Sequence, residues 1–304
     1  MAVRRFSRIT KSNSQASPGK RLWAALKLER PLQVAGVIHS YAAILAEAAG
    51  FKALYLSGAG VANASYGVPD IGITTLEDVL IDVRRITAAT RLPLLVDADT
   101  GWNDPRKAVR EMVRAGAAGV HIEDQVETKR CGHLANKRLV STSEMTARIR
   151  AAVRGRTADP SFVIMARTDA VASEGMEKAL ARAVAYRDAG ADMIFAEALT
   201  DLAQYRSFAR TLEIPILANI TEFGKTPLFT SRQLASAGVS LALYPLSAFR
   251  AMNAAALKVF STLRKHGTQK RVLSEMQTRA ELYAFLGYDP KTGKWNSKGD
   301  YDER

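Results

Sequence analysis

Residues 94–123 read LLVDADTGWNDPRKAVREMVRAGAAGVHIE, with an apolar run at each end and an amphipathic stretch between them. The first run leads into Asp97 and the second into Glu123, and the pair Ala115-Gly116 marks the end of the helix expected between them. Short apolar runs separated by stretches of helical period are typical of parallel sheets, whose strands are buried on both faces. The segment therefore predicts one strand–helix–strand unit.

The same unit recurs along the chain. We expect strands at residues 33–38, 53–57, 94–97, 119–123, 163–167, 193–197, 216–219 and 241–244. Helices are expected at residues 41–49, 75–90, 105–115, 143–153, 175–189, 201–212, 232–237 and 246–265. Eight such units predict an α/β fold, a single closed (β/α)8 barrel of TIM type. A doubly wound sheet is the alternative, but no Gly-x-Gly-x-x-Gly motif follows the first expected strand, so nothing indicates a dinucleotide site.

The two ends of the chain differ in composition from the barrel. Residues 1–18 are rich in Arg and Ser, and the first acidic residue is Glu29, so we expect a basic, disordered extension, with organelle targeting as the alternative. Residues 19–288 are expected to form the barrel domain, with extra helices at 19–29 and 273–286. The later helix packs either on another subunit or on its own barrel. Residues 289–304 are polar and predict a mobile tail.

Composition narrows the class of protein. With 304 residues and 47% hydrophobic content the chain can bury a large core, and no apolar run approaches the ~18 residues of a membrane span. The single cysteine excludes an intramolecular disulfide, and we expect a cytoplasmic protein. The net charge of +13 raises the question of nucleic acid, but the cations are spread out and no groove-binding motif is present. We expect neither a nucleic-acid nor a membrane partner; a basic nucleic-acid or surface-binding protein that uses its N-terminal arm is the competing class.

Seven consecutive expected strands end on a polar side chain directly after an apolar run. These residues are Ser57, Asp97, Glu123, Arg167, Glu197, Asn219 and Tyr244. The carboxyl ends of barrel strands meet at one mouth, where the working residues of such folds lie. A single polar strand end is unremarkable, but the full ring predicts a site.

Carboxylates, whose oxygens are hard metal ligands, are found at and near these strand ends. Asp97 and Asp99 are two residues apart, which on an extended segment places both side chains on one face. Glu123 and Asp70 bring the number of carboxylates to four, without paired His or Cys ligands, so the set favours Mg²⁺ or Mn²⁺ over Zn²⁺. Capping and turn formation before Gly101 is the competing interpretation of the Asp pair.

The only cysteine lies in the motif Lys129-Arg130-Cys131-Gly132-His133. Its cationic neighbours favour the thiolate, which predicts a reactive cysteine on a loop. Arg167, Arg250 and Arg279 could bind carboxylates bidentately, although for the last two an ordinary surface face is the competing interpretation. A divalent cation that binds an α-hydroxy or α-keto carboxylate acts as a Lewis acid, and a cysteine can transfer the proton. The residues predict Mg²⁺-dependent chemistry on a polycarboxylate, a carbon–carbon lyase.

At these residues the sequence resembles the isocitrate lyase and phosphoenolpyruvate mutase superfamily, and more narrowly its 2-methylisocitrate lyases, from about residue 17 to residue 288. The resemblance rests on Tyr55-Leu56-Ser57-Gly58, Pro69-Asp70-Ile71-Gly72-Ile73-Thr74, Asp97-Ala98-Asp99-Thr100-Gly101, His121-Ile122-Glu123-Asp124-Gln125, the cysteine motif, Met165-Ala166-Arg167-Thr168-Asp169-Ala170, Pro215-Ile216-Leu217-Ala218-Asn219-Ile220-Thr221-Glu222-Phe223, Tyr244-Pro245-Leu246-Ser247-Ala248-Phe249-Arg250 and Met276-Gln277-Thr278-Arg279.

This resemblance implies cleavage of 2-methylisocitrate to pyruvate and succinate in the methylcitrate route of propionate breakdown. It implies that Asp97 and Asp99 hold Mg²⁺, with Asp70 and Glu123 acting through water, that Cys131 protonates the succinate carbanion and that Tyr55 is a base or an electrostatic helper. The substrate-binding residues that it implies are Ser57, Gly58, Ala59, Gly132, His133, Arg167, Glu197, Asn219, Ile220, Thr221, Arg250 and Arg279. It also implies a homo-oligomer, a dimer of dimers in which the helix after the last strand is swapped between subunits.

Two departures from the family pattern and two neighbouring activities bear on the substrate. Ala59 stands where the family usually has a second glycine, and residues 101–107 look a few residues shorter than the family's loop. Isocitrate lyase activity is the first alternative, because its substrate differs by a single methyl group. The second is an oxaloacetate decarboxylase or a phosphonate-processing relative, against which the cysteine motif argues.

Overall fold

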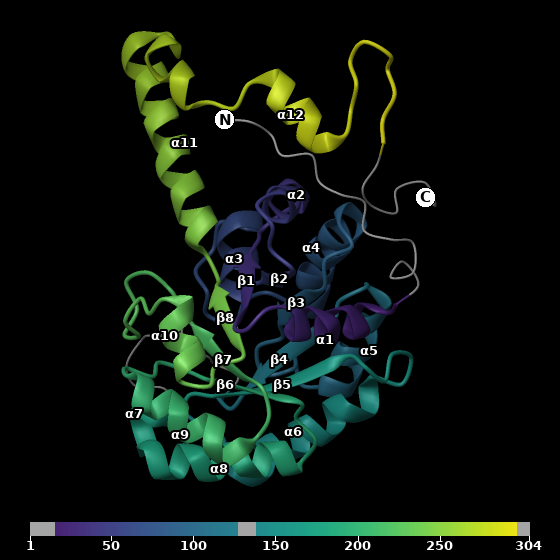
Figure 1. The fold of residues 1–304 in the computed structure, drawn as a ribbon, viewed down its shortest axis with the longest axis vertical. Helices are drawn as coiled ribbons and strands as arrows, with labels where there is room; N and C mark the ends of the chain where they lie inside the picture. The colour runs from purple at the N-terminus through teal and green to yellow at the C-terminus, as the bar shows by residue number, and fades with distance from the viewer. Residues whose placement is uncertain (1–15, 127–137, 297–304) are drawn as a thin grey trace.

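The computed structural model describes residues 16–126 and 138–296, and within them eight parallel strands close into a barrel in the order β1 to β8 (Figure 1). The strands are Leu32–Gly36 (β1), Ala53–Leu56 (β2), Leu94–Asp97 (β3), Gly119–Glu123 (β4), Val163–Thr168 (β5), Met193–Ala196 (β6), Ile216–Asn219 (β7) and Leu241–Tyr244 (β8). Each pairs with its sequence neighbour, and β1 pairs with β8 to close the ring. The predicted TIM-type barrel is confirmed.

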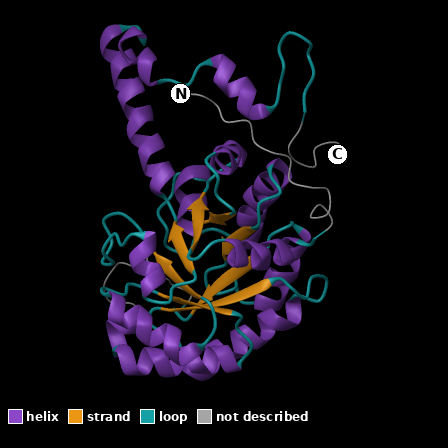
Figure 2. Ribbon diagram, in the orientation of Figure 1, coloured by secondary structure: helices purple, strands orange, loops and turns teal. Residues whose placement is uncertain are grey.

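Helices surround the strands, as Figure 2 shows. They are Pro18–Leu28 (α1), Ser40–Ala48 (α2), Gly58–Gly60 (α3), Leu76–Ala89 (α4), Pro105–Arg114 (α5), Thr142–Gly155 (α6), Val171–Glu174 (α7), Met176–Asp188 (α8), Leu202–Leu212 (α9), Ser231–Ser236 (α10), Ser247–His266 (α11) and Arg279–Leu286 (α12). Local chemistry sets many of their starts. Thr75 and Asp78 form a capping box at α4, and Asp104 caps α5 one residue before Pro105.

Two apolar cores hold the barrel together. One fills its interior, where Leu32, Val34, Tyr55, Leu95 and Met165 pack with residues of α1. The other lies between the outer faces of the strands and the surrounding helices. The strands are buried on both faces for this reason, which explains why they read as continuous apolar runs.

Helix α1 closes the end of the barrel opposite the strand carboxyl ends. Leu22 and Leu26 are buried in the interior core, and Trp23 Nε1 donates to the Ser161 carbonyl at 3.1 Å. The side chain of Asp159 accepts hydrogen bonds from the Ser17 hydroxyl at 3.0 Å and from the Gly19 N–H at 3.2 Å. Ser17 and Pro18 were expected in the N-terminal extension, but they cap and begin this helix.

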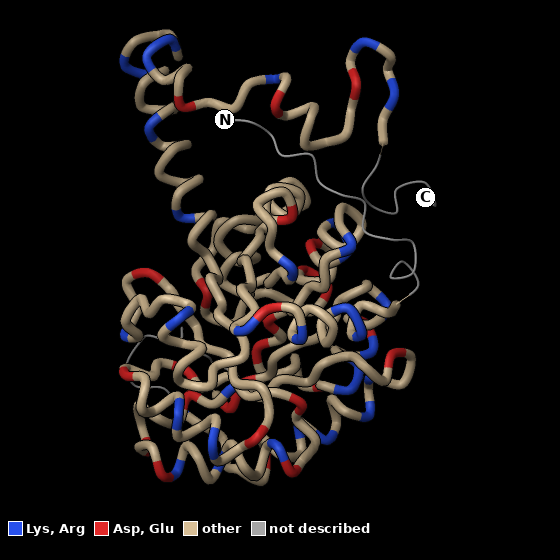
Figure 3. Tube along the Cα trace, in the orientation of Figure 1, with Lys and Arg blue, Asp and Glu red and all other residues tan. Residues whose placement is uncertain are grey.

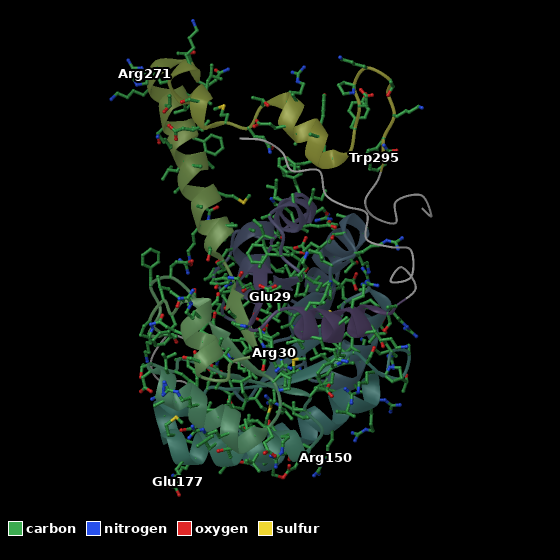
Figure 4. All side chains as sticks on the ribbon, in the orientation of Figure 1. Glu29, Arg30, Arg150, Glu177, Arg271 and Trp295 are labelled. Carbon is green, nitrogen blue, oxygen red and sulfur yellow. The ribbon has the colours of Figure 1, made fainter. Side chains whose placement is uncertain are left out.

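Helix α11 leaves the barrel after β8 as an arm and contains no buried residue (Figure 1). The expected helix at residues 273–286 is wrong as a single element. The chain forms the 3₁₀ helix Lys270–Glu275 (η3), and then Thr278 caps a new helix, α12, in a capping box with Glu281. Helix α12 contacts α2, and the Tyr41 hydroxyl donates to Gln277 Oε1 at 2.6 Å. Figure 4 labels Arg271 at the far end of the arm and Trp295 beyond α12.

Three further segments differ from expectation. Residues after β2 form α3 and the π-helical turn Val61–Ser65 (η2), and α7 precedes α8 as a separate short helix. Residues 289–296, expected within a mobile tail, form a hydrogen-bonded turn in which Tyr288 pairs with Trp295 and Asn296 donates to the Gly287 carbonyl at 2.9 Å. None of the helices in the described part of the chain is both long and apolar enough to cross a membrane.

Charges of both signs are mixed over the outer helices, without a continuous basic stripe in the view of Figure 3. Arg84 pairs with Glu77, Arg148 with Glu144 and Lys258 with Glu275 at 2.6–2.8 Å. The surplus of cations is therefore part of a mixed, solvated surface in the described residues.

Candidate active site

Strand register brings the predicted polar residues together at one mouth of the barrel. Asp97 on β3 pairs with His121 on β4, and Glu123 on β4 pairs with Arg167 on β5. The side chains of Asp97, Asp99, Glu123, Arg167 and Glu197 are each at most 10% exposed. A buried cluster of ionisable groups at the strand ends is the arrangement expected of an active site.

Asp97 and Asp99 converge through a turn. Asp99 follows β3 with φ at 47°, so the two side chains do not lie on one face of an extended segment as expected. The Asp99 N–H donates to Asp97 Oδ1 at 3.1 Å, and Gly101 N–H donates to the Ala98 carbonyl at 2.8 Å. The turn before Gly101, offered as the competing interpretation, is present and is what draws the two carboxylates together.

Gly58 lies against this pair. Its N–H donates to Asp97 Oδ2 at 3.1 Å, and a Cβ placed on it would lie 3.2 Å from both Asp97 Oδ2 and Asp99 Oδ1. One oxygen of each carboxylate therefore approaches the same point. Two converging hard oxygens suit Mg²⁺, which keeps most of its water and needs few direct protein ligands. The pair supplies only two ligands, so a cation bound there would complete its coordination with water.

Tyr55 and His121 form a stacked aromatic pair behind Asp97. The Tyr55 hydroxyl lies 2.8 Å from His121 Nε2 and donates to Asp97 Oδ2 at 3.4 Å, and His121 Nε2 lies 3.5 Å from Asp97 Oδ1. Burial, with the negative charge of Asp97, raises the pKa of Tyr55 well above its ordinary value. Sequence reasoning missed His121, although its place two residues before Glu123 on one strand puts both on the same face.

Arg167 lies among three carboxylates. Its Nε is 2.9 Å from Asp169 Oδ2 and 3.3 Å from Glu123 Oε2, and its Nη2 is 3.8 Å from Glu197 Oε2. Burial disfavours the charged guanidinium, but Asp169, Glu197 and Glu123 outweigh it and raise the pKa of Arg167 well above its usual value. Arg167 is therefore a permanent cation, and it also lies 5.0 Å over the ring of Phe195.

The other predicted site residues lie either at the mouth of the barrel or away from the buried carboxylates. Ser57, Gly58, Asn219, Ile220 and Thr221 are buried at the ends of β2 and β7, and Asn219 Nδ2 donates to Glu197 Oε2 at 3.4 Å. Ala59, in the middle of α3, is half-buried. Asp70 is half-buried in the loop before α4, and its role through water stays a prediction.

The two helix arginines are more distant. Arg250, in the first turn of α11, is 44% exposed, lies 3.6 Å from Glu222 Oε2 and stacks 5.6 Å over Phe223. A cavity of about 660 Å³ beside it is lined by Ile38, His39 and Phe249 among others, but by none of the buried carboxylates. Arg279 is the first residue of α12 and is exposed. The motif that contains Cys131, Gly132 and His133 lies outside the described residues.

The chain is similar to known proteins of one superfamily. The family model for phosphoenolpyruvate phosphomutase matches residues 24–264. The 2-methylisocitrate lyase of Escherichia coli (strain K12) is 59% identical over 276 residues, which cover 90% of this chain and 93% of that protein. The crystal structure of 2,3-dimethylmalate lyase, a PEP mutase/isocitrate lyase superfamily member, matches with a TM-score of 0.83 at 35% identity over 90% of this chain and 92% of that chain.

Phosphonopyruvate hydrolase in complex with oxalate and Mg²⁺ is a further structural match, with a TM-score of 0.77 at 28% identity over 90% of this chain and 95% of that chain. The family match at residues 24–264 contains all eight strands of the closed barrel. The chain therefore belongs to the phosphoenolpyruvate phosphomutase family, and within it to the 2-methylisocitrate lyases.

Proposed function

We propose that this chain cleaves 2-methylisocitrate to pyruvate and succinate, as the resemblance implies, in the methylcitrate route of propionate breakdown. The observation that carries the proposal is a buried cluster of carboxylates around one arginine at the mouth of a barrel 59% identical to a 2-methylisocitrate lyase. The substrate is a small tricarboxylate anion, and we expect the enzyme to work in the cytoplasm without nucleic acid or membrane.

The charge balance of the mouth supports a bound cation. Among the described residues, the carboxylates of Glu123, Asp169 and Glu197 surround the guanidinium of Arg167. Two more, those of Asp97 and Asp99, converge beside Gly58 in the same mouth. Such an excess of buried negative charge repels an anionic substrate unless a cation compensates it. We assign Asp97 and Asp99 as the residues that hold Mg²⁺, or Mn²⁺ in its place, with Asp70 and Glu123 acting through water. When bound, the ion supplies a Lewis acid for the α-hydroxy carboxylate end of the substrate.

The chain's own residues bind the substrate and move its protons. Arg167 binds one substrate carboxylate, while Ser57, Asn219 and Thr221 line the same mouth. The bond between the carbinol carbon and the succinate carbon breaks as the hydroxyl gives its proton to a carboxylate of the buried cluster. The electron pair passes to the succinate carbon, which Cys131 then protonates. Because the pKa of Tyr55 is raised, its phenol keeps the proton and orients the substrate hydroxyl, which favours the helper role over the base role.

An oligomer completes the proposal. Helix α11 exposes Leu257 and Phe260 by 66% and 67%, and an apolar face of this kind indicates a surface that packs on protein. In the superfamily the helix after the last strand is swapped between subunits, and we propose the same dimer of dimers here. In that assembly α12 would exchange its contact with α2 of its own chain for one with a neighbouring subunit, and Arg279 would reach that subunit's mouth, where with Arg250 it binds the remaining substrate carboxylate.

The test is pyruvate release from 2-methylisocitrate, with Mg²⁺ and with EDTA, beside glyoxylate release from isocitrate. We expect fast, chelator-sensitive pyruvate release and a preference for the methylated substrate of about 10–200-fold, the discrimination that one methyl group allows. A preference for isocitrate would support the alternative activity. If the folded protein releases no product from either substrate, the proposal is contradicted, and other α-hydroxy and α-keto dicarboxylates should be tested as substrates.

A further inference from the structure

Arg167 is held in place by a carboxylate that does not itself belong to the ring of strand ends. Asp169 follows β5 and its side chain is fully buried. Its Oδ2 accepts a hydrogen bond from Arg167 Nε at 2.9 Å, and its Oδ1 accepts one from Nη2 at 3.1 Å. This side-on, bidentate contact fixes the plane of the guanidinium as well as its position. It uses two of the five N–H groups of arginine and leaves three for other partners.

Asp169 is in turn fixed from behind by Asp124. The Asp169 N–H donates to Asp124 Oδ1 at 2.9 Å. Asp124 Oδ2 accepts the Thr168 hydroxyl at 2.7 Å and the Tyr186 hydroxyl at 2.9 Å. All four residues are at most 1% exposed. A buried, fully directional network of this type specifies one arrangement of its members.

The network is anchored outside the barrel on α8. Arg182 Nη1 donates to the Tyr186 hydroxyl at 3.1 Å, and its other nitrogens bind both oxygens of Glu174 at 2.7 Å. The hydrogen bonds therefore run without a gap from the ion pair of Arg182 and Glu174 to the guanidinium of Arg167.

Two other carboxylates lie close to Arg167 and compete with Asp169 for its guanidinium. Glu123 Oε2 and Glu197 Oε2 lie 3.3 and 3.8 Å from Arg167 nitrogens, so either could draw the side chain toward itself. Coulomb attraction alone does not choose among three carboxylates at such similar distances. Only Asp169 makes two parallel hydrogen bonds, and it comes with a fixed backbone.

We propose that Asp169 is a positioning residue that orients the Arg167 guanidinium toward the substrate, and that Asp124 positions Asp169. The effect on turnover rests on the proposed function; the effect on the Arg167 side chain does not. Misplacement of a binding group by about 1 Å can lower a rate by ~100-fold. Loss of the bidentate contact should therefore act on catalysis more than on folding.

The first test compares Asp169→Asn with Asp192→Asn. Asp192 is the matched control, because it pairs with Arg156 at 2.5 Å and accepts the Ile164 N–H at 2.8 Å at the opposite end of the strands. We expect kcat/KM for 2-methylisocitrate to fall about 30-fold or more in Asp169→Asn and less than threefold in Asp192→Asn. In an Arg167→Lys background the further effect of Asp169→Asn should shrink to less than threefold, because the group that it positions is gone. Additive losses would indicate a purely structural role and overturn the proposal.

The second test does not need activity. The Nε–H of Arg167 should give a slowly exchanging side-chain signal in ¹⁵N NMR, identified by its absence in Arg167→Lys. We expect this signal in the wild type and in Asp192→Asn, and its loss in Asp169→Asn. The same signal in Asp169→Asn would refute the positioning role. A wild type without lyase activity that still shows this pattern would contradict the proposed function alone.

Discussion

Replacement of Gly58 by alanine should impair the metal site strongly and the stability of the fold only slightly. The new Cβ would lie 3.2 Å from Asp97 Oδ2, 3.2 Å from Asp99 Oδ1 and 3.4 Å from Asp97 Cγ. It would therefore place a methyl group at the point that both carboxylates approach. The Gly58 backbone is helical, at the start of α3, so alanine meets no conformational penalty there.

The expected stability change is small because two effects oppose each other. Contacts of 3.2 Å require the carboxylates to retreat by a few tenths of an ångström, and overpacking of this kind costs ~1–3 kcal/mol. Alanine in place of a helical glycine contributes about 0.5–1 kcal/mol in the other direction. The free energy of unfolding should fall by no more than about 2.5 kcal/mol. Catalysis should fall much further, by about 100-fold, since the shift displaces the ligands of the cation.

Three measurements check this reasoning: thermal unfolding, Mn²⁺ binding followed by electron paramagnetic resonance, and pyruvate release. Gly60→Ala is the matched control on the same short helix. Its Cβ would meet Ile38 Cγ2 at 3.2 Å and Leu246 Cδ2 at 3.4 Å, which are equally close but apolar and flexible. We expect Gly60→Ala to keep Mn²⁺ affinity and turnover within threefold. If Gly58→Ala does the same, Asp97 and Asp99 do not hold the cation in the way that we propose.

Three further predictions concern other parts of the molecule. The pKa of Asp159 is lowered because hydrogen bonds from Ser161 and Ser17 outweigh its desolvation. It therefore stabilises the fold above its unfolded pKa and loses this effect as pH falls through the folded value. Urea unfolding should show Asp159→Asn less stable by about 2 kcal/mol at pH 7, and the difference should shrink below about pH 4; a difference independent of pH would contradict this. Cys131→Ser should keep Mn²⁺ binding and lose pyruvate release by orders of magnitude, whereas a near-full rate would remove Cys131 from the mechanism. The double variant Leu257→Asp, Phe260→Asp should lower the molar mass measured by light scattering together with the activity; an unchanged mass would mean that α11 is not the interface.

The barrel could be predicted because its strands carry their own signal. Residues 94–97, 119–123, 216–219 and 241–244 match the observed strands to the residue, since burial on both faces leaves continuous apolar runs. Short elements without apolar period escaped prediction, among them α3, η2 and α7. The chain after Lys265 was also misread, because Thr278 and Glu281 cap a new helix inside what looks like one helical stretch.

The site could be predicted only in part, for a geometric reason. The ends of the expected strands identify Asp97, Glu123 and Arg167 as candidates. The pairing of Glu123 with Arg167 comes from strand register, which no local sequence pattern contains. His121 and Asp169 were missed because a polar residue inside or just after a strand reads as an ordinary neighbour of a stronger candidate. The left-handed backbone of Asp99, Trp102 and Asn103, none of them glycine, was also invisible in the sequence.

Helix α1 also has a consequence for the order in which the chain can fold during synthesis. Its N-terminal turn is fixed by Asp159, and the bond from the Gly19 N–H spans 140 residues of sequence. Gly19 sits so close to the Ser161 backbone that a Cβ would meet it at 2.4 Å. At the usual pace of translation, roughly 7–28 s pass between the appearance of α1 and that of its docking site. During that interval Leu22, Ala25 and Leu26 have no barrel to enter, so the apolar face of the first helix stays exposed until its docking site has been made.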